Sequence, residues 1–303
     1  MVTVMDGAVA GASEPGSAEP GVLFEVERPV PPVKVPAALS PSRAADFMQC
    51  PLLYRLRVID RLREPPSPAA TRGTLVHAVL DKLFDLPAGS RTPDRAAGLL
   101  EPEWARLQEQ TPELAGLFET AQELDAWLAT AKSLVGKYFT LEDPNRLEPA
   151  QREWFVRTII GAGEERLVLR GVVDRLDVAP NGLLRVVDYK TGKAPSPGFE
   201  TKYLFQMKFY ALVLWKLRGV VPKRLQLIFL GSADVLTYDP DERDLRYTEQ
   251  KVVAVWAAIR TAIDTGRWSP SPSRLCDWCS FKSICSAHGG ETPPVPAIEI
   301  VPA

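Results

Sequence analysis

The sequence predicts an α/β domain. Three consecutive segments have the two-residue period and β-branched content of strands, at residues 153–160, 166–178 and 183–189. Short turns containing glycine separate them, which favours an antiparallel meander. A helix at residues 200–218 and two short strands at 224–230 and 234–238 follow. Further helical periodicity surrounds these strands at residues 73–84, 93–108, 112–139 and 245–266.

Length and composition are those of an ordinary globular protein. The 303 residues suit one large or two ordinary domains, with 46% hydrophobic and 24% charged residues. A net charge of −2 argues against coating nucleic acid through bulk charge, but it leaves room for a local basic groove. No apolar run approaches the roughly 18 residues of a membrane span, and the N-terminus lacks a signal sequence. We expect a cytoplasmic protein without a membrane partner.

Composition also divides the chain. Residues 1–36 are rich in Gly, Ala, Pro, Ser and Glu and predict a disordered tail, with some strand character at residues 22–24. Residues 37–288 form the expected folded domain, with a helical insertion at about 92–140 and a cysteine-bearing segment at 270–288. The proline-rich residues 289–303 are expected to be a flexible tail.

The turn after the second meander strand decides where two carboxylates lie. A three-residue loop with a left-handed Gly182 pairs residues whose numbers sum to 362, and places Asp174 opposite Asp188. A two-residue Asn-Gly turn gives a sum of 363 and sends them to opposite faces. Adjacent carboxylates repel unless a cation lies between them, and oxygen ligands favour Mg²⁺ or Mn²⁺. Lys190 shares a strand face with Asp188.

These segments resemble a known family. Gly171 to Asp174, followed by Val187-Asp188-Tyr189-Lys190-Thr191-Gly192, is similar to the core of the PD-(D/E)XK nucleases, in particular the RecB-like branch. The resemblance implies a restriction-endonuclease-like fold, with a mixed central sheet flanked by helices. It implies that Asp174 and Asp188 bind the metal and that Lys190 orients or stabilises the attacking hydroxide. The implied activity is metal-dependent hydrolysis of DNA, at the ends of single strands, in repair or recombination.

Two further stretches match the same family. A helical histidine is more often structural, but residues 73–77, Gly-Thr-Leu-Val-His, resemble the upstream motif in which His77 reaches the metal. An imidazole ligand suits Mn²⁺ somewhat better than Mg²⁺. Gln206 and Tyr210 share a helical face. They are either an ordinary surface pair or the family's fourth motif, which contacts DNA or steadies the lysine.

Two other acidic residues lie near the predicted site. Glu153 is either a further carboxylate of the site or an exposed residue at the start of a strand. Asp177 lies three residues after Asp174 and therefore on the other strand face, which makes it a poor ligand candidate.

The most basic local stretch contains Tyr54, Arg55 and Arg57 and continues through residues 61–63. One interpretation is a solvated face whose arginine stems cover apolar surface. The other is a patch that contacts phosphates, with Tyr54 available to stack on a base of single-stranded DNA.

Four cysteines predict one metal or cluster site. Cys276, Cys279 and Cys285 have the spacing C-x2-C-x5-C, and Cys50 lies 226 positions before Cys276. Spacing alone does not separate zinc from an iron-sulfur cluster. The run resembles the [4Fe-4S] staple of AddB-type and CRISPR-associated adaptation nucleases. That resemblance implies a cluster that pins the C-terminal segment onto the N-terminal helix. His288 lies three residues after Cys285, but four cysteines already suffice as ligands for one site.

Alternatives from other classes stay open. The chain has no G-x-x-x-x-G-K-[ST] phosphate loop, so a helicase or repair partner would act in trans. A catalytically silent nuclease fold could serve as a DNA-binding or partner-docking module. A zinc-stapled protein unrelated to nucleic acid would leave the order of the matched stretches unexplained.

Overall fold

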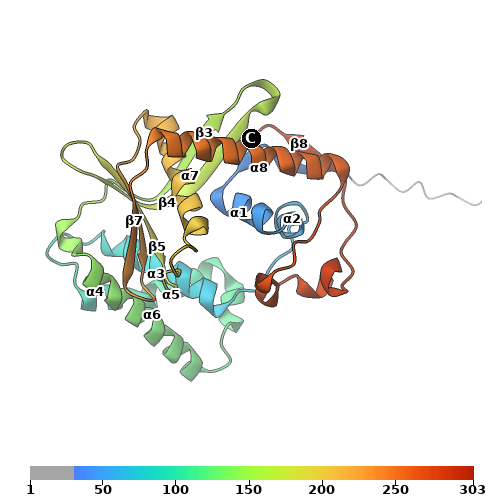
Figure 1. Ribbon diagram of the computed structural model, residues 1–303. Coiled ribbons are helices and arrows are strands. Elements are labelled where there is room, and N and C mark those ends of the chain that lie inside the picture. Colours follow the sequence, from blue (N-terminus) through green and yellow to red (C-terminus); the bar gives the residue numbers. More distant parts are fainter. Residues whose placement is uncertain (1–30) are drawn as a thin grey trace, which may run out of the picture. The chain divides into compact units, whose positions relative to one another are not determined.

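The computed structural model describes residues 31–303 (Figure 1). Most of the expected N-terminal tail, including residues 22–24, therefore lies outside the described residues. The last four residues of that expected tail form strand β1, Val33–Pro36. Ordered structure thus begins before the predicted boundary, because these residues find a partner strand at the other end of the chain. No helix in the described part of the chain is long and apolar enough to cross a membrane.

A six-stranded sheet forms the centre of the domain. Its order is β2-β4-β5-β6-β7, with β3 also paired to β4. β4 pairs antiparallel with β3 and β5, whereas β5 and β6 run parallel. The mixed central sheet is therefore confirmed. The strands of this sheet are β2 Ala38–Leu39, β3 Gln151–Ile160, β4 Leu167–Val178, β5 Leu184–Lys190, β6 Arg224–Phe229 and β7 Asp234–Tyr238.

Helices cover both faces of the sheet (Figure 1). One face carries α1 Pro41–Gln49, α2 Pro51–Tyr54, α7 Thr201–Arg218 and α8 Glu242–Thr265. The other face carries α3 Pro68–Leu83, α4 Pro93–Ala97, α5 Leu100–Gln110 and α6 Ala121–Leu141. A π-helical turn, Arg55–Ile59, extends α2. Short 3₁₀ turns lie at Pro112–Gly116, Pro144–Arg146, Gly163–Glu165, Arg274–Trp278, Lys282–Ile284 and Ser286–His288.

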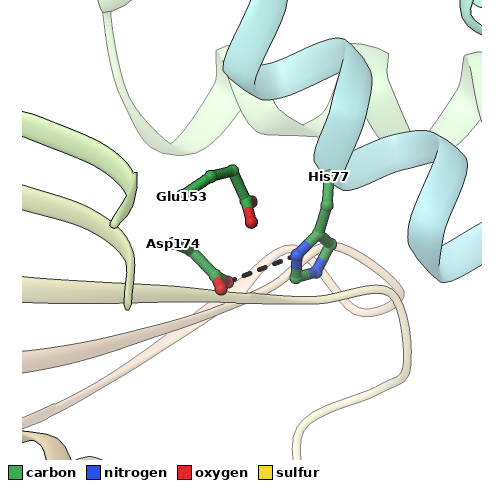
Figure 2. Close-up of side chains that lie close together, drawn as sticks. All are labelled: His77, Glu153 and Asp174. Atoms are coloured by element: carbon green, nitrogen blue, oxygen red, sulfur yellow. Dashed lines mark ion pairs between the residues drawn. The ribbon is translucent and has the colours of Figure 1, made fainter. Parts of the chain in front are cut away.

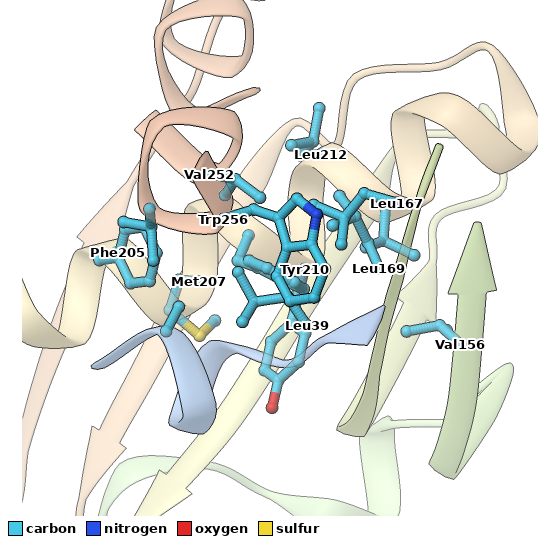
Figure 3. Packing of buried hydrophobic residues seen from close by; sticks show 14 of the residues in the cluster. Leu39, Val156, Leu167, Leu169, Phe205, Met207, Tyr210, Leu212, Val252 and Trp256 are labelled. Atoms are coloured by element: carbon cyan, nitrogen blue, oxygen red, sulfur yellow. The ribbon is translucent and has the colours of Figure 1, made fainter. Parts of the chain in front are cut away.

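The central strands are apolar on both faces, because each face is covered by helices. Leu225, Leu227 and Phe229 of β6 join the core under α7 and α8, while Ile228 joins the core under α3 and α6. Figure 3 shows the first of these cores, in which Trp256 of α8 lies among side chains of α7 and the sheet. Strand β5, which carries Asp188 and Lys190, is packed against core residues on both of its faces.

The predicted helical insertion is a packing layer. Its first predicted helix is two helices, because the chain turns at Gly98 and Leu99 between α4 and α5. The second, predicted from residue 112, begins only at Ala121, where the Thr120 hydroxyl accepts the N–H of Glu123 and caps α6. Trp104, Trp127 and Leu134 of these helices are buried in the same core as Val187 and Tyr189 of β5.

The three-residue turn between β4 and β5 is confirmed. Gly182 has φ +81°, and the N–H of Ala179 donates to the carbonyl of Leu183 at 2.9 Å. The ladder pairs Arg175 with Val187 and Leu176 with Val186, both summing to 362. This register continues one step further to bring Asp174 level with Asp188.

The C-terminal residues are not a free tail. Ile298–Val301 form strand β8, which pairs in parallel with β1 so that Val33 lies beside Ile298. Ile298 and Ile300 are partly buried against the core under α8. The expectation of a flexible tail was wrong, because the apolar alternation at the end of the chain is short and its partner lies far away in sequence.

Candidate active site

The end of β5 lies against the middle of helix α3 in the other layer. Asp174 of β4 accepts the backbone N–H of Tyr189 through Oδ2 at 2.8 Å. His77 of α3 contacts the carbonyl oxygen of the same Tyr189 through Nε2 at 2.9 Å. Side chains from two elements, β4 and α3, are therefore fixed relative to the backbone between Asp188 and Lys190.

Three of these side chains form a cluster with the dimensions of a metal site. Ligand atoms of His77, Glu153 and Asp174 all lie within 4.8 Å of one another. Figure 2 shows the three side chains converging, with His77 descending from α3 and the two carboxylates coming from β3 and β4. An imidazole and two carboxylates are a ligand set that Mn²⁺ and Mg²⁺ accept.

The hydrogen bond to Tyr189 fixes the form of His77. A carbonyl oxygen can only accept, so in the neutral ring Nε2 carries the proton and Nδ1 is an acceptor. Nδ1 then faces Oδ2 of Asp174 at 3.4 Å, which is one acceptor opposite another. The pair is unfavourable unless a proton or a cation lies between them. A divalent cation satisfies both acceptors at once.

The pKa values of the cluster are displaced in the directions that this crowding predicts. Burial, and after it the charge of Asp188, raises the pKa of Asp174 well above its usual range. Burial of the carboxyl group, and after it the charge of Asp174, raises the pKa of Glu153 to about 7, although Glu153 as a whole is an exposed residue. Burial lowers the pKa of His77. In each of the three groups the neutral form is favoured over the charged form. A bound cation would instead favour the charged form of both carboxylates.

Glu153 combines both roles considered from the sequence. It is exposed on β3, yet its carboxylate belongs to the cluster. Its backbone has φ +41°, and the ladder skips it between the pairs of Arg152 with Arg175 and Trp154 with Val173. A positive φ at a non-glycine residue costs on the order of 1–3 kcal/mol. The strain lies at the position where Glu153 stands opposite Asp174.

Asp188 is held by other partners. Its Oδ2 lies 2.6 Å from Lys190 Nζ, and its Oδ1 accepts Gln206 Nε2 at 2.9 Å. Lys190 also donates to Gln206 Oε1 at 3.1 Å. The structure therefore groups His77 and Asp174 with Glu153, and groups Asp188 with Lys190 and Gln206. Asp188 still acts on the first group. After burial, its charge has the largest effect on both pKa values: it raises the pKa of Asp174 further and opposes the lowering of the pKa of His77.

Tyr210 completes the second group. Gln206 Nε2 lies 3.2 Å from the Tyr210 hydroxyl, as expected for side chains one helical turn apart. The ring of Tyr210 lies directly on Gly171 of β4, where an added Cβ would stand 2.6 Å from Cε1. Only glycine leaves room for this contact. Gly171 thus brings α7 and its glutamine close to β5.

Comparison with known proteins fits this arrangement. The family model described as the PD-(D/E)XK nuclease superfamily matches residues 38–286. The chain belongs to this superfamily. Membership supports a nuclease, and divalent metals are general in the superfamily.

Relatives with known sequence or structure agree on the extent of the match. The Gene 69 proteins of Mycobacterium phages D29 and L5 are 24% and 23% identical, over 84% and 81% of this chain and 97% and 95% of their own lengths. The crystal structure of a proposed exonuclease from Eubacterium rectale has a TM-score of 0.52 at 16% identity, covering 80% of this chain and 87% of that one. At this identity the likeness shows a shared fold.

The predicted basic patch is not a surface of this nuclease fold. Tyr54 is 0% exposed and stacked on Trp268. Arg55 is 3% exposed, and its guanidinium donates to the carbonyls of Pro293 and Pro294. Arg57 is partly exposed but paired with Asp46 and Glu64, both at 2.6 Å. The expectation that Tyr54 and Arg55 contact DNA was wrong, because the C-terminal segment folds over them. Tyr54 instead packs on Trp268, and Arg55 binds backbone carbonyls of the C-terminal segment.

A basic groove exists elsewhere, beside Lys190. It has a volume of about 690 Å³ and is lined by Gln206, Tyr210 and three cations that sequence reasoning missed, Arg43, Arg170 and Lys202. These cations are isolated in sequence, so no charged run marks them. His77 and Glu153 line a second groove of about 440 Å³ with Asp81 and Arg106. Two members of the metal-site cluster therefore line the second groove, and Lys190 lines the first.

The four cysteines share one cavity. Cys50 lies at the junction of α1 and α2, and all four free thiols line a narrow cavity of about 40 Å³ with His288. Backbone N–H groups of Ser271 and Ser273 donate to the sulfurs of Cys50 at 3.4 Å and Cys276 at 3.3 Å. Among the described residues, no three thiols lie within 4.8 Å of one another, so they do not form a compact single-ion site. The nature of the staple stays a prediction.

Proposed function

We propose that the chain is a metal-dependent deoxyribonuclease of the RecB-like branch that hydrolyses phosphodiester bonds at the ends of single-stranded DNA. The observation that supports it most is the cluster of His77, Glu153 and Asp174 beside Lys190. DNA repair or recombination, with a helicase or repair partner acting in trans, is the setting that such an activity suits.

A divalent cation fits the cluster for a physical reason. His77 Nδ1 and Asp174 Oδ2 are opposed acceptors, and Glu153 adds a second carboxylate. These three residues would hold Mg²⁺ or Mn²⁺, with Asp188 adjacent. The imidazole favours Mn²⁺. Such a cation supplies Lewis-acid activation of water and of the phosphate.

In this proposal Lys190 is the group that acts on the reacting phosphate. An ammonium has three N–H donors, and Asp188 and Gln206 accept two of them. The third remains for the attacking water or a phosphate oxygen. Because Asp188 and Gln206 also bond each other, Lys190 is fixed before substrate arrives. Pre-positioned donors of this kind lower the barrier without reorganisation during the reaction.

The finer assignments have separate support. Action at a strand end is supported by the Eubacterium rectale neighbour, which is a proposed exonuclease of the same fold. Preference for a single strand is supported by Phe155, an exposed aromatic side chain that lines the basic groove.

We also propose a [4Fe-4S] cluster on Cys50, Cys276, Cys279 and Cys285. The support is that all four sulfurs line one cavity and that two of them already accept backbone N–H groups, as thiolates of such clusters do. Zinc is the less favoured alternative, because Zn–S bonds of about 2.3 Å draw four sulfurs closer together than these thiols lie. A reducing, cytoplasmic compartment suits free thiols and a cluster.

The test is cleavage of end-labelled single-stranded DNA by anaerobically purified protein with Mn²⁺ or Mg²⁺. We expect wild type to degrade the strand and Lys190→Ala to be slower by roughly 10²-fold or more. Lys132→Ala is the matched control, since Lys132 is exposed on α6 outside both grooves. Equal cutting by all three proteins would exclude the role of Lys190. DNA binding without cutting by any of them would instead favour the silent binding module.

A further inference from the structure

Along the exposed face of the β3–β4 strand pair, the chemical type of the side chains changes with distance from the metal-site cluster. The ladder places Phe155 beside Val172 and Arg157 beside Arg170, and Glu153 stands level with Asp174 in the same register. Positions 153, 155 and 157 are all exposed and share one face. Each two-residue step covers about 6.6–6.8 Å. The face therefore presents carboxylates, then apolar surface, then arginines.

The groove beside Lys190 runs along this face. Phe155, Arg170 and Val172 form one wall, and Arg43 from the first turn of α1 belongs to the lining of the same groove. Lys202 from the start of α7 is a further lining residue. The groove therefore joins the candidate catalytic lysine to a set of cations on separate elements.

Those cations form no ion pairs within residues 31–303. No ion pair or side-chain hydrogen bond to Arg43, Arg170 or Lys202 occurs in the described part of the chain. Among the described residues, Asp46 is the one carboxylate that lines the groove, and Arg57 binds it at 2.6 Å. Burial, and after it the charge of Arg170, lowers the pKa of Arg43. Two neighbouring half-buried guanidiniums without a counter-ion are costly in a folded protein, and a phosphate would offset that cost.

The apolar surface between the carboxylates and the arginines includes an exposed aromatic ring. Phe155 is 57% exposed, and its cross-strand neighbour Val172 is 39% exposed. A phenyl ring in a cationic groove offers a stacking surface for a base. Paired bases are already stacked inside a duplex, so the ring is useful only for an unpaired base.

We propose that the nucleotide next to the scissile phosphate binds on this face, with its base stacked on Phe155 and its far phosphate held between Arg43 and Arg170. Lys202 contacts the backbone one step further along the groove. The bound DNA is single-stranded, because the Phe155 ring takes the stacking position that a neighbouring base fills in a duplex. This inference rests on the proposed nuclease function and specifies which residues select its substrate.

The first experiment measures binding of a labelled single strand of 12 nucleotides by fluorescence anisotropy in chelator, so that no cutting occurs. We expect Phe155→Ala to weaken binding about tenfold and Phe155→Tyr to retain it. Tyr247→Ala is the matched control, because Tyr247 is 67% exposed on α8 outside the groove. A duplex of the same sequence should bind more weakly and be insensitive to Phe155.

Salt dependence tests the two arginines. Each lost phosphate contact on a single strand reduces the slope of log affinity against log salt by about 0.7. Arg43→Gln and Arg170→Gln should each show this reduction, and both keep a long polar side chain so that folding is preserved. Arg146→Gln should not, since Arg146 is exposed outside the groove.

A scan of strands with a single abasic site locates the stacked base. Wild type should bind one such strand about tenfold more weakly, and Phe155→Ala should show no further loss on it. If wild type cuts DNA while the Phe155 and Arg170 variants bind and cut like wild type, this inference is overturned and the proposed function stands. If those variants lose binding while wild type cuts nothing, the strand site stands and the proposed function fails. Equal binding of duplex and single strand would also overturn the inference.

Discussion

At the scale of single residues, the site is defined by groups that resist their charged forms. His77 Nδ1 and Asp174 Oδ2 face each other at 3.4 Å, and burial raises the pKa of Asp174 well above its usual range. Glu153, with a pKa raised to about 7, stands on the same cluster. A site built this way binds a cation in exchange for protons.

Metal binding should therefore strengthen as pH rises. A carboxyl whose pKa is raised on folding stabilises the metal-free protein below its unfolded pKa, and that contribution is lost as pH rises through about 7. We expect the melting temperature without metal to fall from pH 5 to pH 8, and the increase produced by Mn²⁺ to grow over the same interval. Differential scanning fluorimetry with and without Mn²⁺ measures both.

Glu153→Gln is the informative variant for this pH dependence. It removes one titrating carboxyl and should flatten the Mn²⁺ effect between pH 6 and 8. An Mn²⁺ effect that is independent of pH in wild type would contradict the assignment of a protonated cluster.

Part of this residue-level picture could be predicted. His77 and Asp174 meet as the family resemblance implied, because their motifs fix helix and strand positions. Glu153 was one of two open alternatives in the sequence, and its place in the cluster could not be decided there because it depends on a positive φ in β3. Tyr54 and Arg55 looked like a basic surface because a linear sequence does not reveal which distant segment will cover them.

At the scale of elements, the contact of α7 with the β4–β5 hairpin decides how Lys190 is held. Gln206 reaches Lys190 and Asp188 only because Tyr210 lies on Gly171. The three-residue turn, Pro180 to Gly182, sets the register on which this depends, and its glycine could be recognised in the sequence. The exact helix bounds could not, because caps such as Thr120 compete with equally good candidates nearby.

Gly171→Ala should disturb the site more than the fold. The new Cβ would lie 2.6 Å from the Tyr210 ring, and such overpacking costs about 1–3 kcal/mol. We expect a lower melting temperature and cleavage at least tenfold slower, because displacement of the Tyr210 ring would shift α7 and move Gln206 away from Lys190.

The matched control for this substitution is Gly136→Ala in α6. No atom lies within 4 Å of its added Cβ, so the helix should gain up to about 1 kcal/mol and activity should be unchanged. A Gly171→Ala protein with wild-type stability and activity would refute the positioning role of Tyr210.

At the scale of the whole molecule, the C-terminal segment closes the domain by three separate contacts. β8 pairs with β1, Arg55 holds the carbonyls of Pro293 and Pro294, and the cysteine cavity joins Cys50 to the segment around Cys279. The cysteine spacing indicated the last contact. The first two join residues more than 230 positions apart, and their acceptors are backbone carbonyls, so no side-chain pattern in the sequence marks them.

Cys279→Ser should therefore weaken the closure without removing it. We expect loss of bound iron, a clearly lower melting temperature, and greater protease sensitivity after residue 270 than in wild type. Ser283→Ala is the control, because Ser283 is exposed in the same segment and outside the cavity. Iron and melting temperature that remain unchanged in Cys279→Ser would refute the cluster.

The central claim is that His77, Glu153 and Asp174 bind the divalent cation on which cleavage depends. The most direct measurement is an Mn²⁺ titration by isothermal calorimetry of wild type, Glu153→Gln and Asp174→Asn, with cleavage of end-labelled single-stranded DNA followed in the same samples. We predict that wild type binds Mn²⁺ and cuts, and that both variants lose affinity and cutting together, by about tenfold or more. Equal Mn²⁺ affinity in all three proteins, or cutting that persists in Asp174→Asn, would contradict the account.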